Sequence, residues 1–350
     1  MKTDKLKVYA ESGEYCVYIG KNASLSAPSL VKDVCGGKRA AVVSDTNVFP
    51  LYGKKIKDGL SSVGYDVFTY VITAGENSKS IENLLSLLSF LSENGFDRHD
   101  VVITLGGGVV GDLGGLASSL YMRGTKLAHL PTSLLAMVDS CIGGKTAVNT
   151  EYGKNTVGTF YEPDLVICDT SFLDSLGKKE YSCGMAEVIK YGVISDAKLF
   201  EKLEKGGSDT ESIVKDCLKI KKALVGADEH DNGIRKLLNF GHTFGHAVEK
   251  LSDYTCTHGE AVAAGMVTAA KLAEKLTLCG HDVTERLVSV LEKYGLPTEY
   301  GMNVSDIADV CLGDKKSDGD ALTLILPEKI GRCVLKKIKK SELKGLVECI

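Results

Sequence analysis

The amino-acid sequence predicts an α/β domain over residues 1–170 and a mainly helical domain over residues 171–350. The chain has 350 residues, which is more than one hydrophobic core usually holds. Its first half alternates short β-branched runs with helix-length amphipathic runs, as in a sheet wrapped by helices. After about Ser171 the chain changes to long runs of Lys, Glu, Leu and Ala with few strand formers, which favour helices.

The elements of the first domain follow from the period of their apolar residues. β-branched runs bounded by turn residues predict five strands: Arg39–Ser44, Asp66–Val71, Val101–Leu105, Thr125–Leu130 and Leu165–Cys168. Helical spacing predicts helices over residues 48–63 and 78–94. Gly, Asp and Asn occupy the turns where a strand passes to a helix. This order of elements is typical of a Rossmann-like nucleotide-binding domain.

The second domain is expected to contain one hairpin among its helices. Two short runs, Leu322–Leu326 and Cys333–Ile338, have the composition of strands. The segment between them, Pro327–Gly331, contains the turn formers Pro and Gly. No internal repeat or low-complexity linker interrupts the chain, so the domain boundary is a change of pattern.

Composition excludes several classes of partner. The formal net charge of -4 is spread over both signs without a block, which predicts neither a nucleic-acid surface nor a membrane surface. Basic residues that matter are therefore expected to be single groups that meet a small anionic ligand. Eleven cysteines form no Cys-x-x-Cys pair and are odd in number, which indicates free thiols in the cytoplasm. The polar N-terminus and the short apolar runs predict no signal peptide or membrane anchor.

The segment Gly106–Gly115 follows a predicted strand and satisfies the pattern Gly-x-Gly-x-x-Gly. Glycines let the backbone approach a pyrophosphate, and the N-terminus of the next helix offers unpaired N–H donors. The segment lies late in the sheet, and no acidic residue follows about twenty positions later to hold a ribose. Phosphate binding is the hypothesis that we favour, and a tight strand-to-helix turn is the alternative.

Polar residues also follow two earlier strands. Asp45–Asn47 closes one strand, and Gly75–Lys79 follows the next. Ligands of open α/β sheets lie outside the carboxyl ends of the strands, so these residues are candidates for cofactor contacts. Each segment taken alone is equally typical of a helix cap or a polar turn.

The segment Gly143–Thr146 resembles the end of a phosphate-binding P-loop. However, Asp139 stands where that loop requires its first glycine, so the P-loop hypothesis fails. We expect instead a glycine-rich loop that runs from Lys145 to Lys154 and Asn155. Such a loop can hold a phosphate by charge and hydrogen bonding, and a solvated loop is the alternative.

Three of the seven histidines lie within one window, residues 239–260. Imidazole is the commonest protein ligand of divalent metals, and two histidines with one glutamate form a zinc site with an open position. Glu187 is a candidate for that glutamate; it lies one predicted helical turn before Lys190, with which it can form an ion pair. Spacing alone selects His242 and His246 as the metal pair, because they lie at i and i+4 on one helical face.

Seven segments in one order resemble those of the 3-dehydroquinate synthase family over essentially the whole chain. They are Gly106–Gly115, Leu130–Asp139, Ile142–Asn149, Gly184–Lys190, Leu238–His246, His258–Met266 and Asp314–Lys316. Several long motifs in the same order are far more specific than any one motif alone. The resemblance implies a carbon–oxygen lyase of the shikimate pathway, which leads to chorismate and the aromatic amino acids.

The resemblance also implies a metal and a cofactor. It implies zinc, or cobalt, held by Glu187, His242 and His258, which replaces the pair that spacing selects and leaves His246 for catalysis or phosphate contact. It implies one NAD that is used and regenerated in each turnover. The positions that match the family's cofactor contacts are Asp45, Asn47, Glu76, Lys79, Gly107, Gly108, Asp112, Thr132, Ser133, Asp139, Lys145 and Lys154.

The implied substrate is 3-deoxy-D-arabino-heptulosonate 7-phosphate, which is converted to 3-dehydroquinate and phosphate. The implied steps are transient oxidation at C5, phosphate elimination, re-reduction, ring opening and an intramolecular aldol closure. The positions implied to contact this substrate are Lys221, Arg235 and Asn239 near its carboxylate and the metal, Lys145, Asn155, Lys190 and His246 near its phosphate, Arg123 from the partner of a homodimer, and one of Lys315 and Lys316.

The chain departs from the family pattern in two places. Leu176–Glu180 lacks a proline and an arginine that are common there, and Lys221 is followed by a second lysine and by Gly226 where the family usually has other residues. Counting back from Arg235 without a gap selects Lys221. The alternatives are another sugar-phosphate cyclase, such as a 2-deoxy-scyllo-inosose synthase, whose substrate has no carboxylate, a metal-dependent alcohol or glycerol dehydrogenase that releases NADH, and a catalytically inactive binding or regulatory protein.

Overall fold

The computed structural model describes residues 3–11, 13–207, 209–253, 255–312 and 320–347. Contacts divide the chain into two compact units. The first contains residues 1–177 together with Lys221–His230, and the second contains residues 178–220 and 231–350. The predicted domain boundary after residue 170 stays a prediction, whereas the α/β fold followed by a largely helical region is confirmed.

The first unit is built on a seven-stranded sheet with the order β1-β2-β9-β6-β5-β3-β4. All neighbouring pairs are parallel except the first, β1 with β2. The five predicted strands are confirmed as β3 (Arg39–Asp45), β4 (Asp66–Ile72), β5 (Val101–Gly106), β6 (Lys126–Pro131) and β9 (Leu165–Asp169). The strands β1 (Asp4–Ala10) and β2 (Gly13–Gly20) were not predicted. In β1, lysines alternate with apolar residues, as suits an edge strand with one wet face.

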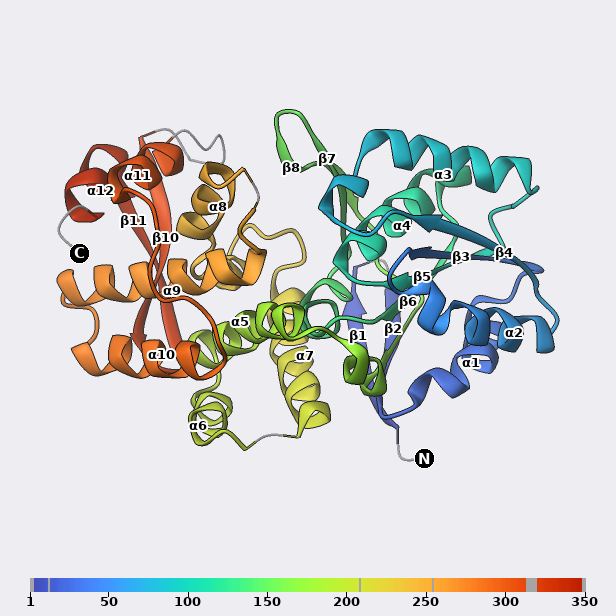
Figure 1. The fold of residues 1–350 in the computed structure, drawn as a ribbon, viewed down its shortest axis with the longest axis horizontal. Helices are drawn as coiled ribbons and strands as arrows, with labels where there is room; N and C mark the ends of the chain where they lie inside the picture. Colours follow the sequence, from blue (N-terminus) through green and yellow to red (C-terminus); the bar gives the residue numbers. More distant parts are fainter. Residues whose placement is uncertain (1–2, 12, 208, 254, 313–319, 348–350) are drawn as a thin grey trace. The chain divides into compact units, whose positions relative to one another are not determined.

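Helices cover both faces of this sheet, which is why its central strands are buried apolar runs. Figure 1 shows α3 (Ile81–Glu93) and α4 (Gly108–Leu120) on one side, and α1 (Ala27–Cys35) and α2 (Lys54–Ser62) on the other. The predicted helix 48–63 begins with a π-helical turn, residues 49–53, and continues as α2. Leu87 and Leu91 of α3 pack with Leu113 and Leu116 of α4 in one apolar cluster.

The prediction of a glycine-rich loop from Lys145 to Asn155 is wrong. The segment forms an antiparallel hairpin of β7 (Lys145–Thr150) and β8 (Gly153–Phe160). Thr146, Ala147 and Val148 are buried in succession and two of the three are β-branched, so this short run favours a strand despite the glycines on either side.

The second unit is mainly helical, as predicted. Its helices are α5 (Lys178–Ile194), α6 (Ala197–Lys205), α8 (His242–Leu251), α9 (His258–Lys275), α10 (His281–Lys293), α11 (Val304–Leu312), α12 (Lys340–Val347) and the first part of α7 (Thr210–Ala227). The late hairpin is confirmed as β10 (Ala321–Lys329) with β11 (Arg332–Lys339). Helix α9 is central, because it packs against α5, α8, α10 and β10 (Figure 1). Within the described ranges, no helix combines the length and apolar character that crossing a bilayer requires.

Candidate active site

Helices α8 and α9 cross at glycines, and this crossing positions the histidines. A Cβ atom on Gly265 of α9 would lie 2.1 Å from the carbonyl oxygen of Gly241, and one on Gly245 would lie 3.1 Å from the Cα atom of Val262. Gly241 itself has φ 80°, a left-handed conformation that glycine adopts at no steric cost. The two backbones therefore approach more closely than any larger side chain allows.

Three side chains from different helices converge beside this crossing. Glu187 comes from α5, His242 is the first residue of α8, and His258 is the first residue of α9. The Glu187 Oε1 atom lies 3.6 Å from His242 Nε2 and 3.3 Å from His258 Nε2. Bonds of about 2.0–2.1 Å in a tetrahedral zinc site put neighbouring ligand atoms about 3.3–3.4 Å apart. The donor set and its spacing therefore fit a divalent metal.

The two imidazoles have different partners on their outer nitrogens. His242 Nδ1 lies 3.1 Å from the carbonyl oxygen of Phe240, whereas His258 Nδ1 lies 3.4 Å from the carboxylate of Glu249. Burial lowers the pKa of His242 to about 3. Burial also opposes charge on His258, but Glu187 and Glu249 outweigh it and raise the pKa of His258 to about 9. The field around His258 thus favours a cation.

His246 lies next to these ligands but is exposed. Its ring centroid is 5.3 Å from that of His242 and 6.2 Å from that of His258. A second group of possible metal ligands joins His246 and His258 to Glu249. Neither group contains both His242 and His246, so the pair that spacing alone selects is not supported by the geometry.

Three further residues expected at the site lie in the second unit. Lys190 is buried one turn after Glu187 on α5, and its Nζ atom forms an ion pair with the Glu187 carboxylate. Arg235, which is also buried, and Asn239 lie in the short 3₁₀-helix of residues 234–239 that leads into α8. Two buried basic groups therefore come from the elements that surround the candidate metal ligands.

Several of the residues expected to contact the cofactor lie in the first unit, at the carboxyl ends of its parallel strands. Asp45 ends β3, Glu76 and Lys79 follow β4, and Gly107 precedes α4 at the end of β5. Thr132 follows β6 and donates its N–H to the carbonyl of Gly106 over 2.9 Å. The sheet order β6-β5-β3-β4 places these ends side by side. The edge of the sheet thus has the position in which α/β folds bind ligands.

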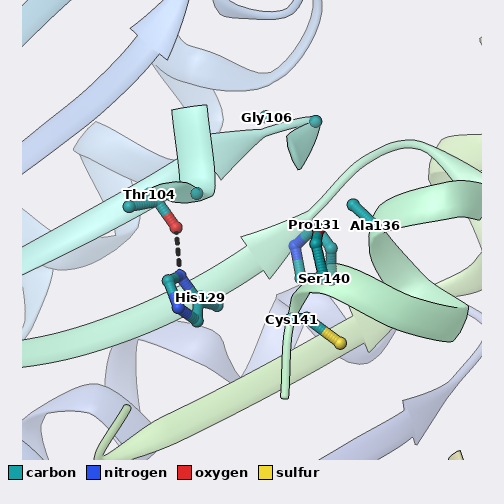
Figure 2. Close-up of a pocket in the computed structure, with 9 residues that line it drawn as sticks. Thr104, Gly106, His129, Pro131, Ala136, Ser140 and Cys141 are labelled. Carbon is teal, nitrogen blue, oxygen red and sulfur yellow. Dashed lines mark hydrogen bonds between the residues drawn. The ribbon is translucent and has the colours of Figure 1, made fainter. Parts of the chain in front are cut away.

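A small pocket lies below the glycine-rich turn (Figure 2). Its walls include Gly106 and Gly107, and its floor holds His129, whose Nδ1 is hydrogen-bonded to Thr104 Oγ1 over 2.6 Å. Burial lowers the pKa of His129 to about 4, so the ring is neutral at neutral pH. Sequence reasoning did not select His129 or Thr104.

Several of the expected cofactor residues contact one another. Lys79 donates a hydrogen bond to the carboxylate of Asp112. Burial raises the pKa of Asp112 and Lys79 lowers it, and the effect of burial is the larger, so the pKa of Asp112 is raised overall. Glu76 Oε1 accepts a hydrogen bond from the side chain of Asn149 over 2.8 Å. Asp45 Oδ1 accepts from the backbone N–H of Asn47 at 2.8 Å, as a turn-capping carboxylate does.

Lys221 lies in the segment that groups with the first unit, and it pairs with an expected cofactor residue. Its Nζ atom donates to both the carboxylate and the backbone carbonyl of Asp139, and Lys221 is buried. Lys221 and Asp139 are 82 positions apart in the sequence, and no local sequence pattern predicts their contact.

The remaining expected residues have simpler surroundings. Lys145 and Asn155 are exposed on the β7–β8 hairpin, and Asn155 has φ 55°. Arg123 is exposed with φ 63°, directly after Met122 with φ 51°. The other positions of the expected set are Gly108 at the start of α4, Ser133 after β6, Lys154 on β8, and Lys315 and Lys316, which lie outside the described residues.

Glu249 is a site residue that sequence reasoning missed. It lies seven positions after His242 on α8, so the signal was present in the helical spacing of the histidine window. Only 2% of Glu249 is exposed, and such burial of a carboxylate calls for a specific partner.

Comparison with known families matches residues 69–317 of the chain. Residues 69–183 match the family described as 3-dehydroquinate synthase N-terminal, and residues 184–317 match 3-dehydroquinate synthase C-terminal. The 3-dehydroquinate synthase of Clostridium acetobutylicum is 42% identical, over 98% of this chain and 98% of that protein. The 3-dehydroquinate synthase of Streptococcus mutans is 40% identical, over 98% of this chain and 99% of that protein.

Solved structures resemble the chain over its full length. One is a 2-deoxy-scyllo-inosose synthase complexed with carbaglucose-6-phosphate, NAD+ and Co2+, with a TM-score of 0.88, 25% identity and coverage of 99% of this chain and 100% of that one. Another is a 2-epi-5-epi-valiolone synthase from Streptomyces hygroscopicus with NAD+ and Zn2+, with a TM-score of 0.88, 28% identity and coverage of 100% and 99%. A probable glycerol dehydrogenase from Sinorhizobium meliloti, 15% identical with a TM-score of 0.63 over 94% of both chains, shares the fold.

Proposed function

The chain belongs to the 3-dehydroquinate synthase family and is a lyase of the shikimate pathway, and from this premise we propose which of its residues carry the reaction. The observation that carries the proposal is the convergence of Glu187, His242 and His258, whose ligand atoms have the spacing of a zinc site. We propose that these three residues hold zinc or cobalt. When bound, the metal would polarise the substrate's hydroxyls, and NAD would accept and return a hydride.

The cofactor residues are proposed from their place at the strand ends of the first unit. The backbone N–H groups that begin α4, at Gly107 and Gly108, can donate hydrogen bonds to the pyrophosphate of NAD. Thr132 and Ser133 follow the neighbouring strand, β6, and add hydroxyl donors. Asp45 and the other polar residues of the expected cofactor set can bind the ribose groups of NAD.

The substrate is proposed to be 3-deoxy-D-arabino-heptulosonate 7-phosphate. Lys190 and His246 are placed beside the metal ligands and would receive the phosphate, with Lys145 and Asn155 of the hairpin also proposed for it. Arg235 offers a planar fork that suits the carboxylate. Lys221 would exchange the Asp139 carboxylate for that of the substrate, because both are the same kind of acceptor.

Proton movement is proposed to rely on the substrate's own phosphate and on His246, the exposed imidazole of the cluster. An imidazole changes charge near neutral pH and can take or return a proton at its ring nitrogens. Lys190 would hold the departing phosphate by its charge, and much of the rate enhancement would come from orienting the substrate. A cytoplasmic homodimer, in which Arg123 contributes to the substrate site of the partner subunit, belongs to the same proposal.

The experiment supplies the heptulosonate phosphate with catalytic NAD and Zn2+ and measures phosphate and NADH. Stoichiometric phosphate release without net NADH supports the proposal. Net NADH from a simple polyol, or turnover of glucose 6-phosphate in place of the heptulosonate, would refute it. His258→Ala should lose both metal retention and turnover, whereas His281→Ala, which removes an exposed imidazole in the same unit, should keep both.

A further inference from the structure

A buried carboxylate lies directly behind one of the candidate metal ligands. Glu249 is on α8, and its Oε1 atom is 3.4 Å from Nδ1 of His258. Only 2% of Glu249 is exposed, compared with 29% of the His258 side chain. The carboxylate is therefore held inside the second unit, at the edge of the ring that faces away from Glu187.

The two nitrogens of His258 have separate surroundings. Nε2 lies 3.3 Å from Glu187 Oε1, on the side where the three candidate ligands converge, so Nε2 is the nitrogen that would bind a metal held there. A neutral imidazole that binds a metal through Nε2 carries its proton on Nδ1. An acceptor at Nδ1 fixes both this tautomer and the rotation of the ring. We propose that Glu249 is that acceptor and is a positioning residue for the metal centre.

The backbone of His258 is already fixed, which leaves the orientation of its ring for Glu249 to set. Thr257 and Glu260 form a capping box at the start of α9, in which Glu260 Oε2 accepts from Thr257 N over 2.8 Å. The next residue, Gly259, donates to Cys183 Sγ over 3.1 Å, and a Cβ atom on Gly259 would lie 2.4 Å from the Cα atom of Cys183. Main-chain contacts on both sides thus hold residue 258 in place.

In the alternative arrangement Glu249 is itself a metal ligand, and the other two ligands are His246 and Nδ1 of His258. In that group His246 is exposed, whereas in the first group Glu187 and His242 are both buried. The centroid of the His258 ring is also nearer to that of His242, at 5.2 Å, than to that of His246, at 6.2 Å. The geometry therefore favours Glu249 behind the ligand and one metal in each chain.

His258 and His242 differ in the group that their outer ring nitrogen contacts. The outer nitrogen of His242 meets a neutral backbone carbonyl, which no side-chain substitution removes, whereas that of His258 meets a charged side chain. Loss of an outer carboxylate behind a metal-binding histidine weakens metal affinity by roughly 10- to 100-fold. Glu249→Ala removes both the acceptor and the charge. Glu249→Gln keeps an acceptor oxygen at nearly the same place, so it should recover part of the affinity.

This inference rests on the proposed metal centre, and its test measures metal binding without turnover. Purified full-length wild type, Glu249→Gln, Glu249→Ala and the exposed control Glu285→Gln are titrated with Co2+ or Zn2+ against a chromophoric chelator. Cobalt absorption reports the ligand geometry, and urea unfolding of the metal-free proteins checks that each variant folds. We expect one metal per chain, with roughly 10-fold weaker binding in Glu249→Gln, up to 100-fold in Glu249→Ala, and no change in the control.

Two results would overturn the inference. One is an affinity of Glu249→Ala within threefold of the wild type. The other is binding of two metals by the wild type and one by Glu249→Ala, which would make Glu249 a direct ligand. A wild type that binds no metal would instead refute the proposed metal centre itself, so the two failures are distinguishable.

Discussion

Adding one methyl group at Gly265 should separate α8 from α9 and disturb the metal site. A Cβ atom there would lie 2.1 Å from the carbonyl oxygen of Gly241 and 2.9 Å from the nitrogen of Gly245. Carbon and carbonyl oxygen rarely approach within about 3.3 Å. Gly265→Ala therefore forces the start of α8 to withdraw by about 1 Å, and His242 is the residue that follows Gly241.

The size of the effect follows from two opposing contributions. Overpacking a buried site costs about 1–3 kcal/mol, whereas replacing a helical glycine by alanine stabilises by up to about 1 kcal/mol. We expect a net loss of about 1–2 kcal/mol in the free energy of unfolding. Metal sites tolerate shifts of only about 0.2 Å in their ligand distances, so metal affinity should fall at least about 10-fold.

The assay combines urea unfolding of the metal-free protein with a chelator titration of its metal affinity. Gly345→Ala is the matched control, because Gly345 also lies in a helix of the second unit and, among the described residues, no atom beyond its chain neighbours and its own helix backbone lies within 4 Å of an added Cβ. The control should gain about 0.5–1 kcal/mol and keep its metal affinity. If Gly265→Ala matched the control in both measurements, the argument that this crossing positions His242 would be refuted.

Three further predictions concern the first unit. Burial lowers the pKa of His129 to about 4, from about 6.5 in the unfolded chain, so between these pH values the unfolded chain binds the proton more readily and the folded protein loses stability as the pH falls. His129→Gln removes this titration. Between pH 6.5 and 4 the variant should therefore lose less free energy of unfolding than the wild type, by on the order of 3 kcal/mol, as measured by urea unfolding. Lys79→Met leaves the Asp112 carboxylate without its lysine and should cost about 3 kcal/mol and weaken NAD binding in calorimetry. Lys221→Met should lower kcat/KM for the heptulosonate phosphate at unchanged metal content, measured by phosphate release.

Each of these predictions has an outcome that contradicts it. If the free energy of unfolding of His129→Gln depended on pH in the same way as that of the wild type, the His129 ring would have to be protonated or exposed in the folded protein. Full stability and NAD affinity in Lys79→Met would remove Lys79 from the cofactor site. A loss of metal from Lys221→Met would show that its effect is structural, because Lys221 belongs to the first unit and the metal ligands to the second.

Most of the sheet was predictable because buried parallel strands are continuous apolar runs. Val101–Gly106 is buried at every position, and its composition shows this directly. The β7–β8 hairpin was missed because its β-branched residues are mixed with glycine, lysine and asparagine, and one of its strands is almost wholly exposed. Strand propensity depends on the neighbours that a strand meets, and a single sequence does not contain them.

Long-range pairs were the least predictable features. The ion pair of Lys221 with Asp139 joins residues 82 positions apart, and the assignment of Lys221–His230 to the first unit interrupts the second in sequence. Such contacts depend on the packing of whole elements, so local patterns carry no sign of them.

By itself the sequence determined five of the seven strands in the main sheet, the mainly helical character of the second part, the gathering of three histidines in one window and, through its ordered motifs, the family to which the chain belongs. Only the tertiary structure decided which nitrogen of each ring faces Glu187 and that Glu249 lies behind His258. The physical reason is that helical spacing describes one helix at a time. The meeting of α5, α8 and α9 depends instead on a close crossing at glycines, whose consequences appear only when the helices pack.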